Sequence, residues 1–285
     1  MRELHAAIAA PDYHGSHGAT PDKQGELMNQ TLIFAHRGAN KEAAENTRSA
    51  FDKALRYAID GMETDVQLSR DEVAVLWHDK LLGKVGLPDR HLDDFDFAQL
   101  QAMNFAAHFS ADAVPESVMT LQAFLDAYRT RCRLLLEIKN RDWESPARHE
   151  IKVRQTLAMA GAAHGDAIIV SSFNLASLVY AHRCAPEFPL VYNFEPEQTI
   201  DDARRALTEQ PFLHGLCLPI VSLHEPIVKL LRDHGKSIAV YTCNSDEEIS
   251  RALRLGVDIL ISDVPQKALA LRDAVKTGQS SAESN

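Results

Sequence analysis

Acidic and basic side chains occur in short, regularly spaced groups within the 285-residue chain. One residue separates Glu63 from Asp65, and one residue separates Glu137 from Lys139. Residues two apart in a β-strand point to the same face, so each pair would lie side by side if these segments are strands. Charges buried on such a face are costly unless they meet one another, a cation or a charged ligand. The spacing therefore predicts a shared, charged binding site.

The composition of this group favours a metal ion. Three carboxylates, those of Glu63, Asp65 and Glu137, accompany a single lysine, which leaves an excess of negative charge. All three candidate ligands offer oxygen atoms. Oxygen ligands suit Mg²⁺ or Ca²⁺ better than zinc or copper, so we expect one divalent cation of this kind.

Two histidines and an arginine supply the other groups that phosphoryl chemistry needs. Arg37 and Lys139, together with the cation, could hold a phosphate and offset the charge that develops in the transition state. Imidazoles titrate near neutral pH, so His36 and His78 could exchange protons as base and acid. No Walker glycine loop is present, which argues against cleavage of nucleoside triphosphates.

Short apolar runs alternate with helical patterns, which predicts an α/β fold with buried parallel strands. The expected strands are residues 32–35, 62–66, 134–138, 168–171, 190–193, 216–218, 238–241 and 259–261. The expected helices are residues 46–57, 147–160, 175–182, 199–207, 225–234, 246–255 and 265–274.

One further apolar run, residues 73–77, follows the second strand too closely for a parallel crossover. We interpret it as a hairpin arm, which leaves eight β/α units, the number that closes a TIM (β/α)8 barrel. Residues 79–119 then form an insertion between strands two and three, with a helical piece near 97–105. The alternative is an open doubly wound sheet, but no G-x-G-x-x-G motif follows any strand to support it.

The ends and the overall composition limit the remaining possibilities. We expect residues 1–30 to be a tail, residues 31–275 a single barrel domain and residues 276–285 a second tail. His14 and His17 in the first tail could bind a metal, although two histidines alone make a poor site. A net charge of −10 argues against nucleic acid as a partner. No apolar run is long enough for a transmembrane helix.

Cysteine usage and the first residues predict a cytoplasmic enzyme. The four cysteines are widely spaced and form no C-x-x-C pair, so free thiols are favoured over two disulfides. The apolar stretch at residues 4–10 is short and interrupted, which makes it a weak signal peptide. The sequence leaves self-association into a homo-oligomer open.

Several motifs, taken in order, resemble the glycerophosphodiester phosphodiesterases, a TIM-barrel family related to phosphatidylinositol-specific phospholipase C. The matching stretches are His36-Arg37-Gly38, Glu45-Asn46-Thr47, Gly61-Met-Glu63-Thr-Asp65-Val66, His78-Asp79, Glu137-Ile-Lys139 and Ser262-Asp263-Val-Pro265. The resemblance covers nearly all of residues 31–270. It implies metal-dependent hydrolysis of small-molecule glycerophosphodiesters to glycerol 3-phosphate and an alcohol.

The resemblance also implies roles for single residues. Glu63, Asp65 and Glu137 match the metal ligands, and His36 and His78 match the acid/base pair. The phosphate contacts match Arg37 and Lys139, and Glu45 matches a supporting residue near the metal. Tyr241 stands where the family usually has tryptophan and is expected to line the pocket for the organic part of the substrate. Related phospholipases suggest a cyclic phosphate intermediate. We assign His36 as base and His78 as acid, although the sequence alone also allows the reverse order.

Two other functions remain as alternatives. A lysophospholipase D-like enzyme would use a similar site but stop at the cyclic phosphate, and a membrane-binding apolar patch would favour it. A barrel kept as a phosphate-binding module would not need both histidines and all three carboxylates. The sequence does not identify the head group of the substrate.

Overall fold

The computed structural model describes residues 31–110, 112–161 and 167–282. The expected tail of residues 1–30, with His14 and His17, lies outside the described residues. Within the described part, no helix is long and apolar enough to cross a membrane.

Eight parallel strands form a closed barrel, which confirms the predicted TIM (β/α)8 fold. In spatial order the strands are β1 (Leu32–His36), β11 (Ile259–Ser262), β10 (Ser237–Tyr241), β9 (Gly215–Pro219), β8 (Leu190–Asn193), β7 (Ile168–Ser172), β6 (Arg133–Ile138) and β2 (Gly61–Leu68). The first strand pairs with β11 on one side and with β2 on the other, which closes the ring. All eight strands run in one direction, so their carboxyl ends meet at one end of the barrel.

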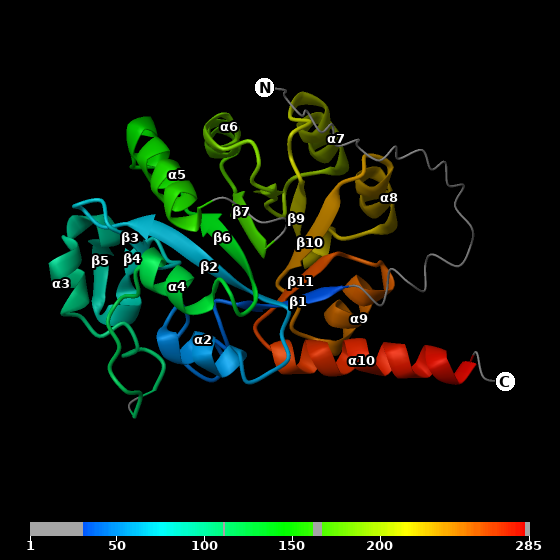
Figure 1. Ribbon diagram of the computed structural model, residues 1–285, viewed down its shortest axis with the longest axis horizontal. Coiled ribbons are helices and arrows are strands. Elements are labelled where there is room, and N and C mark those ends of the chain that lie inside the picture. Colours follow the sequence, from blue (N-terminus) through cyan, green and yellow to red (C-terminus); the bar gives the residue numbers. More distant parts are fainter. Residues whose placement is uncertain (1–30, 111, 162–166, 283–285) are drawn as a thin grey trace, which may run out of the picture.

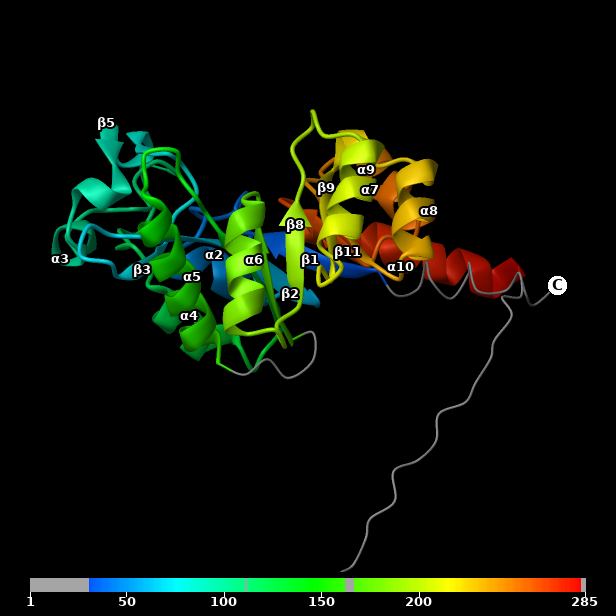
Figure 2. The same ribbon diagram turned by 90° about the horizontal axis from the view of Figure 1, so that it is seen from above.

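A helix follows each barrel strand and covers the outside of the ring (Figures 1 and 2). The helices are α2 (Arg48–Ala54), α4 (Leu121–Tyr128), α5 (Pro146–Ala160), α6 (Leu175–Cys184), α7 (Ile200–Glu209), α8 (Glu225–Asp233), α9 (Asp246–Arg254) and α10 (Pro265–Ala282). Most begin at a Ser, Thr or Asn whose side chain accepts a hydrogen bond from the first turn, as Thr120 does for α4. These caps fix where each strand-to-helix loop ends.

The insertion between β2 and β6 forms a small unit beside the barrel, drawn in cyan in Figure 1. It contains β3 (Ala74–Leu76), β4 (Leu81–Leu82), η1 (Gly83–Val85), β5 (Leu87–His91), η2 (Leu92–Asp94) and α3 (Phe97–Gln101). The antiparallel pairing of β3 with β2 confirms the hairpin arm predicted from residues 73–77. Its own apolar core includes Trp77 and Phe105, whose rings meet edge to face at 5.2 Å.

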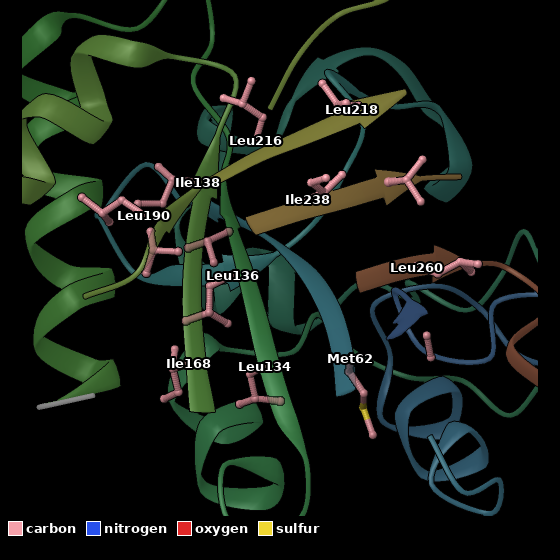
Figure 3. Packing of buried hydrophobic residues seen from close by; sticks show 14 of the residues in the cluster. Met62, Leu134, Leu136, Ile138, Ile168, Leu190, Leu216, Leu218, Ile238 and Leu260 are labelled. Carbon is pink, nitrogen blue, oxygen red and sulfur yellow. The ribbon is translucent and has the colours of Figure 1, made fainter. Parts of the chain in front are cut away.

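Alternate residues of every barrel strand point outward into the layer beneath the helices. Figure 3 shows part of this layer, where Leu134, Leu136 and Ile138 of β6 lie near Ile168 of β7 and Leu190 of β8. The residues between them point into the barrel. The inward set forms a second, separate apolar cluster, which contains Phe34, Leu135, Ile169, Val191, Cys217, Ala239, Ile259 and Ile261. The strands are therefore buried on both faces, as their continuous apolar runs predict.

Some predicted boundaries are wrong. The sequence analysis did not identify α4, which supplies the helix of the second β/α unit. The terminal helix α10 continues to Ala282 instead of ending at Ala274. The helical piece expected near 97–105 is shorter, because α3 ends at Gln101.

Candidate active site

The predicted charged residues come together at the carboxyl ends of the barrel strands. Glu63 and Asp65 point inward from β2, and Glu137 points inward from the neighbouring β6, where it pairs in register with Asp65. Each of these three residues is less than a tenth exposed. One carboxylate oxygen from each lies within 4.8 Å of the other two, so the group could hold a metal ion.

Two cations lie against these carboxylates. The ammonium group of Lys139 lies 2.5 Å from Glu137 Oε1 and 3.1 Å from Asp65 Oδ1. Arg37 Nε lies 3.0 Å from Asp65 Oδ2. Burial would raise the pKa of Asp65, but Arg37 and Lys139 hold it well below its usual range. Asp65 is therefore an anion that is already compensated by its neighbours.

Among the described residues, Glu63 differs from the other two carboxylates because no lysine or arginine lies within 4.0 Å of it. Its Oε2 atom is buried and has no hydrogen-bond partner, and His36 Nε2 lies 3.9 Å away. Burial, together with the nearby charge of Asp65, raises the pKa of Glu63 well above its usual value. When all three acids are ionised, they exceed Arg37 and Lys139 by one negative charge. An unpaired buried oxygen and this excess negative charge are the features that a divalent cation would compensate, so the donor set fits such an ion.

His36 forms a pair with a carboxylate from the far end of the chain. Its Nδ1 atom lies 2.6 Å from Asp263 Oδ1, at the end of β11. Asn40 donates to the same oxygen, and Asn244 donates to Asp263 Oδ2. Burial, followed by the charge of Arg37, lowers the pKa of His36. Both amides orient Asp263, and Asp263 orients the imidazole.

His78 has a similar partner from its own segment. Its Nδ1 atom lies 2.8 Å from Asp79 Oδ1. Lys84, from η1 of the insertion, donates to Glu45 Oε1 at 2.8 Å and lies 3.0 Å from Asp79 Oδ2. Glu45 also accepts a hydrogen bond of 3.2 Å from Arg37. Glu45 thus connects the arginine to the His78 side of the site.

A tight turn after β1 sets the direction of Arg37. Arg37 and Gly38 both have positive φ angles, of 56° and 83°. A Cβ atom on Gly38 would lie 2.6 Å from the backbone carbon of Ala50, so only glycine fits there. Asn46, with φ of 57°, donates to Asp65 Oδ2 at 2.9 Å. Gly38 and Asn46 are therefore needed for the backbone conformation of this turn, in addition to the chemical groups that the motifs supply.

Both histidines line one cavity of about 170 Å³ at this end of the barrel. The other lining residues are Arg37, Glu63, Leu135, Glu137, Lys139, Phe173, Asn193, Cys217, Tyr241, Thr242 and Ile261. Tyr241 meets Phe173 edge to face at 5.9 Å, and its hydroxyl donates to the carbonyl of Phe194. An open groove of about 830 Å³ shares several of these residues and leads outward.

A second large cavity, of about 730 Å³, lies at the opposite end of the barrel, where the strands begin. Its charged residues are mostly paired with one another. Arg232 lies 2.8 Å from Asp258, and Arg272 lies 2.5 Å from Asp60. The two aspartates also accept hydrogen bonds from backbone N–H groups of β10 and β1. These charges stabilise the starts of the strands, and the chemistry belongs to the other end.

Comparison with known families decides the identity of this barrel. Residues 36–267 match the model of the Glycerophosphoryl diester phosphodiesterase family. This chain belongs to that family. The matched range begins at His36 and includes every predicted site residue.

Individual glycerophosphodiester phosphodiesterases agree with this assignment. A curated glycerophosphodiester phosphodiesterase from Bacillus altitudinis is 28% identical over 257 residues, which covers 86% of this chain and all of that protein. A phosphodiesterase from Oleispira antarctica, solved in complex with the product sn-glycerol-3-phosphate, has a TM-score of 0.76 at 24% identity and covers 86% of this chain and 97% of its own. A solved relative from Silicibacter pomeroyi also has a TM-score of 0.76, at 22% identity, with coverage of 89% and 98%. The two structures establish the fold, and the family match establishes a glycerophosphodiester phosphodiesterase, an enzyme instead of a phosphate-binding module.

The structure brings all nine predicted site residues to one end of the barrel. It adds partners that the sequence analysis left without a role, above all Asp263, Asp79, Asn46 and Lys84. Asp79 and Asp263 lay within the matched motifs, so their positions were visible, but their pairing with the histidines was not. Lys84 carried no signal, because it lies in the insertion, outside every recognised motif.

Proposed function

We propose that the chain hydrolyses glycerophosphodiesters to glycerol 3-phosphate and an alcohol, with His36 and His78 as the acid/base pair and one divalent cation bound by Glu63, Asp65 and Glu137. The observation that carries this proposal is the shared cavity. Two imidazoles, each with its Nδ1 atom on a carboxylate, face the same space as the buried acids. The solved relative from Oleispira antarctica, which holds sn-glycerol-3-phosphate, supports the product class.

Charge balance supports the phosphate site. With Glu63 ionised, the three carboxylates exceed Arg37 and Lys139 by one negative charge, and a bound Mg²⁺ or Ca²⁺ would reverse that balance. The cation would then polarise a phosphoryl oxygen and offset charge in the transition state. Arg37 and Lys139 point into the same space and would contact the remaining phosphate oxygens as charge-assisted donors. Asp65 holds the side chains of Arg37 and Lys139 in place, so the two side chains need little reorganisation when substrate binds.

The histidines supply the proton transfers. We assign His36 Nε2 as the base that takes the proton of the glycerol hydroxyl beside the phosphate. The hydroxyl oxygen bonds to phosphorus. The bond between phosphorus and the oxygen of the leaving alcohol breaks as His78 Nε2 donates a proton to that oxygen. A cyclic phosphate results, and water then opens it with the two histidines in reversed roles. Hydrogen bonding of each Nδ1 atom to a carboxylate leaves Nε2 free for these transfers.

The alcohol part of the substrate would occupy the outer groove. Tyr241 and Phe173 form an aromatic wall between the inner cavity and this groove. Beyond them the groove is polar, with Asn140, Asn174 and Glu195 among its lining residues. A small hydrophilic alcohol fits this environment better than a long acyl chain, which favours glycerophosphodiesters over lysophospholipids.

We further infer a cytoplasmic location. The four cysteines are free, and two of them, Cys217 and Cys243, are buried. Free thiols of this kind are typical of a reducing compartment.

The site assignment can be tested with variants that separate metal binding from proton transfer. Glu63→Gln and Asp65→Asn should weaken the binding of Mg²⁺ or Ca²⁺, measured by calorimetry, and reduce turnover together. His36→Ala and His78→Ala should retain metal affinity while kcat falls by about 10²–10⁴-fold. Glu247→Gln, an exposed substitution on α9, is the control and should change neither quantity.

Three results would contradict specific parts of the proposal. Wild-type turnover after complete chelation would exclude the cation. Wild-type turnover by both histidine variants would exclude the acid/base pair. A cyclic phosphate that accumulates as the final product, followed by ³¹P NMR, would instead identify the lysophospholipase D-like lyase reaction.

A further inference from the structure

His36 and His78 are held by the fold in different ways. His36 is the last residue of β1, a barrel strand that is hydrogen-bonded on both sides. His78 follows β3, which lies outside the barrel and pairs only with β2 among the described strands. Residues 77–80 belong to no regular element. Their carbonyl groups therefore have no strand partner, and another part of the molecule must fix them.

Two buried side chains bind three consecutive carbonyls of this segment. Gln67, on β2, donates from Nε2 to the carbonyls of Trp77 and Asp79 at 2.7 and 3.1 Å. Arg141, which follows β6, donates from Nη2 to the carbonyl of His78 and, at 3.0 Å, to that of Asp79. Arg141 Nε also donates to Gln67 Oε1 at 3.2 Å, so the two side chains form one unit.

The Arg141 side of this unit is itself anchored to α5. The backbone N–H of Arg141 donates to Glu144 Oε2, and its carbonyl lies 3.2 Å from His149 Nε2. Lys152, which is fully buried, donates to both oxygens of Glu144 and to the carbonyl of Lys139. A rigid support of this kind lets a single guanidinium define the position of a loop.

The acceptors of Arg141 are unusual for a buried guanidinium. Arg141 is 9% exposed, yet among the described residues no carboxylate lies within ion-pair distance of it. Its charge is directed to neutral carbonyls instead, and burying a charge in this way is costly. A requirement for precise placement of His78 would explain why the fold keeps a buried charge at Arg141 despite this loss of stability.

We propose that Arg141 and Gln67 are positioning residues that fix the backbone of His78 and thereby place its imidazole for proton transfer. This inference rests on the proposed role of His78 and adds that the role depends on Arg141. A displacement of about 1 Å in a catalytic group can reduce turnover by about 10²-fold. Loss of the Arg141 bonds should therefore reduce kcat far more than it changes KM.

The test is a double-mutant cycle between Arg141 and His78 in the full-length, metal-loaded protein. Arg141→Met should lower kcat by about 10–10²-fold on a glycerophosphodiester, with KM within about 3-fold. In the His78→Ala background the same substitution should have almost no further effect, because its target is already absent. The loss should also be smaller for the p-nitrophenyl diester of glycerol 3-phosphate, whose leaving group departs without a proton.

Arg148→Met provides a matched control. Arg148 donates to the carbonyls of Leu68 and Ser69, at the β2 side of the same hairpin, and among the described residues it makes no hydrogen bond to residues 77–80. It also lies 3.4 Å from Glu144 Oε1, but Lys152 binds both oxygens of Glu144 and keeps that carboxylate in place without Arg148. We expect its loss to lower the melting temperature while kcat stays within about 3-fold of wild type. Arg141→Lys keeps the charge but cannot bind both carbonyls and Gln67 together, so its kcat should fall nearly as far as that of Arg141→Met. This variant also provides the test if Arg141→Met does not fold.

The possible failures point to different conclusions. Wild-type kcat in Arg141→Lys, or an equal loss from Arg141→Met with and without His78, would overturn the inference alone. An equal kcat loss in Arg148→Met would assign the effect to stability and would also overturn it. Wild-type turnover by His78→Ala would overturn the proposed acid role, and the inference with it.

Discussion

Each of the two histidines proposed as acid and base directs its Nδ1 atom to a carboxylate, and both histidines line the cavity. The Nδ1 atoms lie 2.6 Å from Asp263 and 2.8 Å from Asp79. An ionised carboxylate only accepts hydrogen bonds, so Nδ1 must carry the proton and Nε2 is left to exchange one with substrate. The two aspartates thus fix the tautomer as well as the orientation.

This arrangement gives the first prediction, for Asp263. Burial would raise the pKa of Asp263, but its hydrogen bond with His36 holds it well below its usual range, so it is ionised at neutral pH. In Asp263→Asn the new NH₂ group would face one of the donors Asn40 and Asn244. We expect kcat to fall, though by less than the roughly 10²–10⁴-fold loss for removing the imidazole itself, while metal affinity is retained. Steady-state kinetics and calorimetry measure the two quantities.

Asp246→Asn is the control for this change, because Asp246 is exposed and pairs with Lys267 outside the site. It should leave kcat unchanged. Unaltered kcat in Asp263→Asn would show that Asp263 does not orient the base.

The cysteines give a prediction about thiol chemistry. Burial raises the pKa of Cys132 to about 11 and that of Cys243 to about 12. At pH 8 only about one Cys132 thiol in a thousand would be the reactive thiolate. Exposed Cys184 should therefore be alkylated first by iodoacetamide, as followed by peptide mass spectrometry, and the other three should react only on unfolding. Alkylation of Cys217 before Cys184 in the native protein would contradict the predicted order.

At the scale of single residues, the sequence revealed the chemical groups but not all their partners. The E-x-D and E-x-K spacings fixed which side chains share a face, because strand geometry alternates strictly. Asp263 lies 227 positions from His36, and no local pattern connects them. Such pairings depend on barrel closure and become visible only in the folded structure.

Among the elements, the turn that follows β1 carries a steric requirement at Gly38 that a second glycine can calibrate. Gly38 and Gly86 have nearly the same φ angle, 83° and 85°, but only Gly38 has a close neighbour. A Cβ atom on Gly38 would approach the backbone of Ala50 within 2.6 Å, whereas one on Gly86 would meet nothing within 4 Å. Alanine at Gly86 would measure the free-energy cost of a positive φ angle alone. Alanine at Gly38 would add the cost of the close approach to Ala50.

We predict unequal effects for Gly38→Ala and Gly86→Ala. An L-residue in the left-handed region costs about 1–2 kcal/mol, and both variants should lose this amount of stability. Gly38→Ala should lose clearly more, because the backbone of α2 must move, and its kcat should fall as Arg37 shifts. Urea unfolding measures the stabilities. Equal losses in both variants would show that the close approach to Ala50 has no energetic weight.

The elements that were predicted well share strong local signals. The hairpin arm at β3 followed from chain length alone, since too few residues separate it from β2 for a crossover. Helix α4 was missed although its signals were present. Thr120 caps it, and Leu121, Phe124, Leu125 and Tyr128 form its buried stripe at helical spacing.

At the scale of the whole molecule, the barrel interior divides into two zones along its axis. Charged and polar groups gather where the strands end, and apolar side chains fill the barrel below them. Phe34 is the largest member of that inner cluster, and its ring lies over Gly61 of the adjacent β2. A Cβ atom on Gly61 would lie 2.4 Å from Phe34 Cζ, so the missing side chain makes room for the ring.

This complementarity gives the last prediction. Gly61→Ala should overpack the barrel and lower the free energy of unfolding by about 1–3 kcal/mol, because neither β1 nor β2 can move away without opening the barrel. Phe34→Leu removes the ring and should cost about 1 kcal/mol or more. The double variant should be more stable than the sum of the single losses allows, by roughly 0.5–3 kcal/mol, since leucine leaves space for the new methyl group. Urea unfolding of the four proteins gives this coupling energy.

Ile227→Val on α8, outside the barrel, is the control, and its loss of stability should simply add to that of Gly61→Ala. Strict additivity between Phe34 and Gly61 would mean that the barrel relaxes around the extra methyl group and that this contact does not restrict how β1 closes against β2.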